Sequence, residues 1–273
     1  MSVRKWTALA AVLGLLLCLG ACEGMTGVSG SRSEPEGESS APSRAASLHR
    51  EITEAIDKVA ALDGISASGE MRVRIDDGGS ALTQTMRFGL QALKKIRYYN
   101  RYVTLETSLM GQQRTLSCWC RDGVKYVKDG EEKTRQFYLT QCSTYFEDLK
   151  ALLPESAFEG AELQWGDGEQ NVSLVLRGPG LEAWLPLVLP QPFFAGDTDG
   201  CTVEGPVELS VVVGEDGYPR SWNVKLSAAV ADGESTMTLD LDIAWILEQP
   251  GEPVTVEWPN GDEYPLVRPD GGN

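Results

Sequence analysis

The chain has 273 residues, 42% of them hydrophobic, and a formal net charge of −16. This composition is sufficient for a globular core, and the length suits one domain once a leader and a linker are removed. The acidic balance argues against nucleic-acid binding, which needs basic patches for phosphates, and against a domain that lies flat on anionic lipid.

The N-terminus has the pattern of a secretory leader. Arg4 and Lys5 precede an apolar run from Ala8 to Leu19, which is too short to remain as a transmembrane helix. Residues 1–21 are therefore predicted to form a signal peptide. Because the leader contains two basic residues and no acid, its removal makes the mature chain two units more negative.

The end of the leader, Leu19-Gly20-Ala21-Cys22, resembles the lipobox of bacterial lipoproteins. The resemblance implies that Cys22 becomes the mature N-terminus, is diacylated on sulfur and anchors the protein extracytoplasmically, at the outer face of the cell membrane. The alternative is an ordinary cleaved signal in which Cys22 is incidental.

A flexible tether and a helix are expected next. Residues 22–46 are rich in Gly, Ser, Pro, Glu and Arg and cannot bury enough apolar surface to fold. A helix capped by Ser47 and ended by Asp63-Gly64 follows, with apolar residues at helical spacing at Leu48, Ile52, Ile56, Val59 and Ala60. The folded domain is predicted to span residues 47–266, with a disordered tail at 267–273.

Antiparallel strands are predicted from alternating apolar and polar residues. Asp-Gly pairs between them suit hairpin turns, which need positive φ. The predicted strands of the first half lie at Met71–Ile75, Met86–Ala92, Val103–Leu105, Leu116–Cys120, Tyr126–Lys128 and Arg135–Tyr138. The pairs are Asp77-Gly78, Asp122-Gly123 and Asp129-Gly130.

The middle of the chain changes pattern. We expect a helix over Ser143–Leu153 that Pro154 ends, and a strand over Val172–Leu176. Residues Gly180–Leu189 suit a short helix or lid, and Gln191–Asp197 suits a loop.

The last third predicts a three-stranded meander through Val207–Val213, Trp222–Val230 and Met237–Trp245. Val254–Trp258 is expected to add a short edge strand. A sheet with one apolar face needs a cover, so we predict an α+β fold in which helices pack on the concave face of a curved antiparallel sheet, a half-barrel.

Three phrases resemble uncharacterised Gram-positive lipoproteins that are similar to the LolA and LppX group. They are Asp122-Gly123 before Tyr126, Gly214-Glu215-Asp216-Gly217 before Trp222–Leu226, and Glu252-Pro253-Val254 before Trp258-Pro259. The resemblance spans about Ser47 to Tyr264 and implies a half-barrel whose hollow is filled by helices and, in several related proteins, holds acyl chains. It transfers no ligand residue, because that group has no fixed ligand motif that can be placed here.

Six cysteines are present. Cys18 leaves with the leader and Cys22 is the predicted acylation site, which leaves four candidates for disulfides in an oxidising compartment: Cys118, Cys120, Cys142 and Cys201. A disulfide between one of the first pair and Cys142, or buried thiols, both fit. The single-residue spacing of Cys118 and Cys120 departs from the hooks of zinc sites, so no metal is predicted.

No catalytic residue and no cofactor are predicted, and the chain is not expected to be an enzyme. His49, the single histidine, is interpreted as a solvated residue at the start of the first helix. Asp240 and Asp242 share one strand face, as a pair of catalytic acids would, but a solvated outer face explains them better. Known nucleophile, phosphate-binding and dinucleotide-binding motifs are missing.

An apolar segment is the candidate ligand site. Trp184, Leu185, Leu189, Phe193 and Phe194 would line or gate a cavity for an acyl chain; the structural alternative, which is favoured, is a lid that completes the core. The predicted function is a membrane-anchored lipoprotein that binds a lipid or other amphiphile. The alternative is a cell-envelope interaction protein with a filled core, whose protein partner is unknown.

Overall fold

The computed structural model describes residues 43–95, 99–109, 112–137, 149–166, 168–185, 201–232 and 235–267. Within these ranges, eleven strands form a single antiparallel sheet in the order β6-β5-β4-β3-β2-β1-β11-β10-β9-β8-β7. The sheet is open, with β6 and β7 as its two edges. The strands are β1 (Gly64–Asp76), β2 (Ala81–Lys94), β3 (Tyr99–Leu109), β4 (Gln112–Arg121), β5 (Val124–Asp129), β6 (Glu132–Phe137), β7 (Glu162–Gly166), β8 (Glu169–Leu176), β9 (Cys201–Gly214), β10 (Pro219–Asp232) and β11 (Ser235–Glu248).

Two meanders meet at the centre of this sheet. One runs from β1 to β6 and the other from β7 to β11, and β1 pairs with β11 over almost its whole length, from Ser66↔Glu248 to Asp76↔Thr238. The predicted strands up to Met237–Trp245 are confirmed within the described residues, with one addition, β7, which pairs with β8, and one exception at Val254–Trp258. The Asp-Gly turns are also confirmed where the structure describes them, since Gly78, Gly123 and Gly130 all have positive φ.

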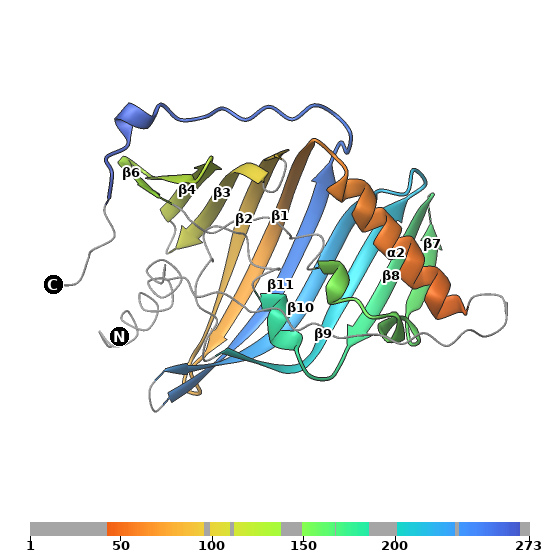
Figure 1. Cartoon of the computed structure of the whole chain (residues 1–273). Coiled ribbons are helices and arrows are strands. Elements are labelled where there is room, and N and C mark those ends of the chain that lie inside the picture. Colours follow the sequence, from red (N-terminus) through yellow and green to blue (C-terminus); the bar gives the residue numbers. More distant parts are fainter. Residues whose placement is uncertain are drawn as a thin grey trace, which may run out of the picture.

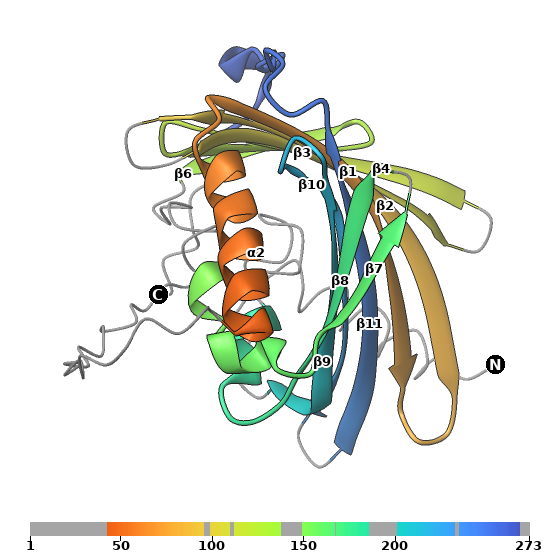
Figure 2. The same cartoon turned by 90° about the vertical axis from the view of Figure 1, so that its right-hand side faces the viewer.

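Helix α2 (Arg44–Ala60) lies across one face of the sheet, in front of β8 to β10 (Figure 1). The side view shows helix and sheet as two layers (Figure 2). Three short 3-10 helices are also described, η1 (Glu155–Phe158), η2 (Leu181–Trp184) and η3 (Gly261–Glu263). Of the helices in the described ranges, none is both long enough and apolar enough to cross a membrane.

The first helix begins earlier than the sequence predicted. Ser43, not Ser47, is the cap: its side chain accepts a hydrogen bond from Ala46 N at 3.1 Å. Ser47 lies inside the helix and donates its backbone N–H to Ser43 O at 2.9 Å. Arg44 and the two alanines that follow are strong helix formers, so they extend the helix into the predicted tether.

The C-terminal segment is not the edge strand that was expected over Val254–Trp258. Residues 253–260 have no regular structure and run from the end of β11 toward η3 beside β6 (Figure 1). β11 is already paired on both sides, by β1 and β10, so a further strand has no free edge there. The segment 253–267, called the strap below, reaches β6 instead, where Leu266 forms a parallel bridge with Arg135.

Aromatic side chains hold the strap on the face opposite α2. Trp119 stacks on Tyr102 with ring centroids 4.8 Å apart and donates its indole N–H to Glu257 O at 2.9 Å. Tyr264 of the strap is buried and contacts the edges of Trp119 and Tyr126. The strap therefore ties the end of the chain to the β3–β6 half of the sheet.

Candidate functional site

The face of the sheet that receives α2 carries a hydrophobic cluster that reaches from β5 to β7. Alternating residues of each strand point to this side, so that Met71 of β1 pairs with Ile243 of β11 and Met86 of β2. They belong to one hydrophobic cluster that also contains Leu48, Ile52 and Ile56 of α2. We call this side the inner face.

The described helices pack over only one half of the inner face. α2 contacts β9 and β10, η1 contacts β8, and η2 contacts β9. The apolar face continues past them across the other meander, where its members include Met86, Phe88, Val103, Leu105 and Cys118. These side chains are themselves buried in the structure.

Two of the five predicted ligand residues lie in described segments. Trp184 closes η2 with 1% of its surface exposed, and Leu185 follows it at 2%. Both belong to the core cluster, beside β9. Leu189, Phe193 and Phe194 lie outside the described residues, as does Cys22.

His49 is not the solvated residue that its position suggested. Its Nε2 lies 3.0 Å from Leu153 O, and its ring packs edge-on against Phe158 of η1 with centroids 5.3 Å apart. The side chain is partly buried. His49 thus fastens α2 to the segment before β7, a tertiary contact that helix periodicity does not reveal.

The predicted cysteine pair lies on the inner face of β4. Cys118 and Cys120 are buried and both carry free thiols, so neither forms the disulfide that was one of the two alternatives. Cys201 is the first residue of β9, and Cys142 lies outside the described residues.

Strand register gives the two thiols different surroundings. Cys118 is opposite Val103 and Val127, whereas Cys120 is opposite Arg101 and Lys125. These two cations are the feature that sequence reasoning missed, because they come from strands that precede and follow β4. The only available signal was a basic residue at an inward position in each neighbouring strand.

The pKa values of the thiols move in opposite directions. Burial raises the pKa of the Cys118 thiol well above its ordinary value, and its hydrogen bond to Cys120 acts in the same direction. That hydrogen bond lowers the pKa of Cys120 to about 7, helped by the charges of Arg101 and Lys125 and opposed by burial. Cys120 is therefore the more acidic thiol of the pair.

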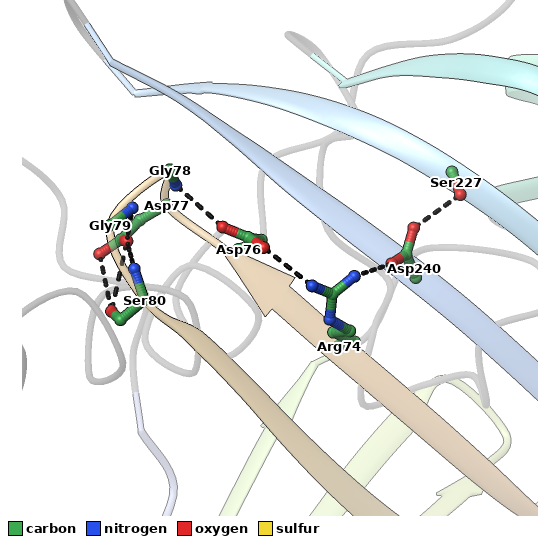
Figure 3. Close-up of polar contacts among 8 residues, drawn as sticks. All are labelled: Arg74, Asp76, Asp77, Gly78, Gly79, Ser80, Ser227 and Asp240. Atoms are coloured by element: carbon green, nitrogen blue, oxygen red, sulfur yellow. Dashed lines mark hydrogen bonds and ion pairs between the residues drawn. The ribbon is translucent and has the colours of Figure 1, made fainter.

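The opposite, outer face carries a hollow of about 410 Å³ at the centre of the sheet, where most of the lining residues are charged or polar. Arg74 of β1 bridges Asp76 and Asp240 at 2.9 and 3.2 Å, and Ser227 of β10 donates to Asp240 at 2.7 Å (Figure 3). In the turn that joins β1 to β2, the side chain of Asp77 accepts hydrogen bonds from Gly79 N and Ser80 N.

Asp240 and Asp242 are both engaged across strands. Asp242 accepts a hydrogen bond from Asn223 at 2.8 Å and lies 3.8 Å from Lys225 Nζ. Each carboxylate is about two-fifths exposed. These exposures agree with the interpretation as a solvated outer face, and the ion pairs of the two residues link neighbouring strands.

Comparisons with known proteins identify no family. No family model matches the chain, and no curated protein matches its sequence. Among solved structures, the chain is similar to a LolA superfamily protein from Nitrosomonas europaea, with 11% identity over 74% of this chain and 94% of that one and a TM-score of 0.25.

Two further solved structures are similar to the same extent. A DUF1329 family protein from Desulfovibrio piger is 13% identical, covering 73% of this chain and 90% of that one, with a TM-score of 0.26. The ywiB protein from Bacillus subtilis is 9% identical, covering 68% and 94%, with a TM-score of 0.23. Scores this low do not place the chain in a family.

Proposed function

We propose that this protein is an extracytoplasmic lipoprotein, anchored through Cys22, whose LolA/LppX-like domain binds a lipid or other amphiphile without catalysing a reaction. The observation that supports binding most is the extent of the inner face. Its apolar surface runs from β5 to β7, while the described helices pack over β8 to β10. In this proposal the helices lie on the concave side, and an acyl chain occupies the β1–β5 half.

The binding test compares two substitutions at neighbouring positions of β2. Leu90 belongs to the inner face and is partly buried, whereas Gln91 points to the outer face. Leu90→Glu places a charge on the proposed acyl-chain surface, and Gln91→Glu places the same charge outside it. Each protein is purified under native conditions and weighed by native mass spectrometry before and after organic extraction.

An adduct of lipid mass that extraction removes is expected for the original chain and for Gln91→Glu, and its loss is expected for Leu90→Glu. Unfolding transitions of both variants establish that they fold. An original chain without any adduct that also fails to take up a fluorescent fatty acid would contradict the proposal.

The anchor is tested separately. Cys22→Ser removes the only sulfur that the lipobox offers for acylation, so the variant should leave the membrane fraction and lose incorporation of labelled palmitate. Retention in the membrane fraction would contradict anchoring through Cys22 and would leave the binding proposal untouched.

The almost complete burial of the inner-face side chains favours a second function, that of a cell-envelope interaction protein with a filled core. Trp184, Leu185 and the inner-face residues Met71 and Val103 are all at most 2% exposed. A core of this kind needs no ligand to exclude water. A bare mass in the native spectrum, combined with capture of an envelope protein in cross-linking at the cell surface, would favour this function.

A further inference from the structure

The two thiols of β4 form a compact pair on the inner face. Residues two apart in a strand point to the same side, and Cys118 and Cys120 are 0% and 7% exposed. Their side chains are hydrogen-bonded to each other. The Cα atoms of such residues lie about 6.8 Å apart, at the upper limit for a disulfide, so the strand holds the sulfurs together without favouring a bond between them.

The charges around the pair are asymmetric. Arg101 and Lys125 stand directly opposite Cys120 on the two neighbouring strands. Valines stand opposite Cys118 on the same strands. A buried thiol pair with two cations at one end favours a group that carries net negative charge.

We propose that Cys118 and Cys120 bind a soft monovalent metal ion, Cu(I), in a two-coordinate site. Thiolate ligands favour Cu(I), zinc and iron–sulfur clusters among the biological first-row metals, and of these Cu(I) is the one that two thiolates alone satisfy. A linear sulfur–metal–sulfur unit spans roughly 4.5 Å at the ~2.3 Å bond length of zinc thiolates, and Cys118 and Cys120 are close enough for their side chains to share a hydrogen bond.

Charge balance accounts for the role of the cations. Binding of one Cu(I) ion displaces one proton from each thiol and leaves a bis-thiolate complex with a single net negative charge. Arg101 and Lys125 offset that charge at the Cys120 end. No oxidation or reduction takes place, because the ion enters and stays as Cu(I).

Zinc does not fit this arrangement. Structural zinc needs four ligands, and the described part of the chain contains no group of three or more Cys, His, Asp or Glu side chains arranged to hold a metal. The site thus discriminates against zinc by the number of its ligands.

The test is a competition between the reduced, oxygen-free full chain and a chromogenic Cu(I) chelator, bathocuproine disulfonate. The original chain is expected to withdraw one more equivalent of Cu(I) than Cys118→Ser, Cys120→Ser or the double variant. Cys201→Ser is expected to keep that equivalent. X-ray absorption of the one-equivalent complex should show two sulfur ligands.

A second comparison keeps both cysteine ligands and removes one positive charge at a time. Lys125→Met should weaken Cu(I) binding about tenfold, whereas Lys128→Met, which removes an exposed lysine from the same strand, should leave it unchanged. Unaltered Cu(I) uptake by the double cysteine variant, or a requirement for Cys201, would overturn the two-coordinate assignment. Tight Zn(II) binding by the same pair would contradict the proposed selectivity for Cu(I) over zinc.

Discussion

The ring of Phe88 on β2 lies over the backbone of Gly69 on β1. The two residues are directly opposite in the strand register, and a Cβ atom added to Gly69 would be 2.2 Å from the ring. The absence of that atom lets the ring reach across β1 to Trp245 of β11, with centroids 4.3 Å apart. This contact links the two meanders at the seam where they join.

Gly69→Ala should destabilise the fold by about 2 kcal/mol, because the new methyl overlaps both the Phe88 ring and the Ala244 carbonyl in a packed core. Urea unfolding followed by tryptophan fluorescence measures the free energy of unfolding. The matched control is Gly166→Ala, where no atom lies within 4 Å of the new Cβ and little change is expected. Equal stability of the two variants would contradict the packing role of Gly69.

Tyr264→Ala should cost about 3 kcal/mol, the usual loss on truncating a buried aromatic side chain. The ring is 4% exposed and contacts two aromatic rings of the sheet, and Lys133 Nζ lies 5.5 Å from its centroid. Thermal unfolding gives the stability, and limited proteolysis at residues 253–267 reports release of the strap. Trp165→Ala, at a site that is 71% exposed, should change the stability by less than about 0.5 kcal/mol.

The strap should also loosen in acid. Its ion pair with β6, between Lys133 and Glu263 at 2.5 Å, lowers the pKa of Glu263 below 4.5 and raises the pKa of Lys133 above 10.5. The carboxylate's contribution is therefore complete above pH 4.5 and lost as pH falls through the lowered pKa, and the lysine's contribution is lost as pH rises through its raised pKa.

Hydrogen exchange of the strap at pH 3 and pH 7, corrected for intrinsic rates, measures this effect. Glu263→Gln should remove most of the acid sensitivity, whereas Glu252→Gln, an exposed residue of the preceding turn, should retain it. An identical acid response in Glu263→Gln would assign the sensitivity to other groups. The effect is expected to be small, because an exposed ion pair is screened by solvent.

Ser43→Ala should destabilise the protein by about 1 kcal/mol, because the side chain satisfies a backbone N–H in the first turn of α2. Ser47→Ala should be neutral or slightly stabilising, because that serine lies within the helix, where alanine is the better former. Equilibrium unfolding of both variants distinguishes the two caps. A greater loss of unfolding free energy from Ser47→Ala than from Ser43→Ala would identify Ser47 as the cap, as the sequence suggested.

Most strands could be predicted because each exposes one face and buries the other, which imposes an alternation visible along the chain. Asp122-Gly123 and Asp129-Gly130 marked hairpins for a comparable local reason, since tight turns need positive φ. β7 escaped prediction because Trp165 of this short edge strand is largely exposed, which weakens the alternation.

The candidate sites were less accessible to sequence reasoning. The spacing of Cys118 and Cys120 placed both on one strand face, but nothing local indicated that Arg101 and Lys125 would stand opposite Cys120. The contact of His49 with Leu153 joins residues 104 positions apart. Such pairs depend on register and on packing between distant elements.

The sequence by itself determined most of the strands, the Asp-Gly turns and the largely apolar character of one sheet face, because these follow from interactions within a few residues. Only the tertiary structure decided that β1 pairs with β11, that α2 lies over β8 to β10, and that the strap crosses to β6. These choices depend on which strand edges remain free after the local hairpins form, and on which apolar surfaces can be buried together. Both are properties of the whole sheet.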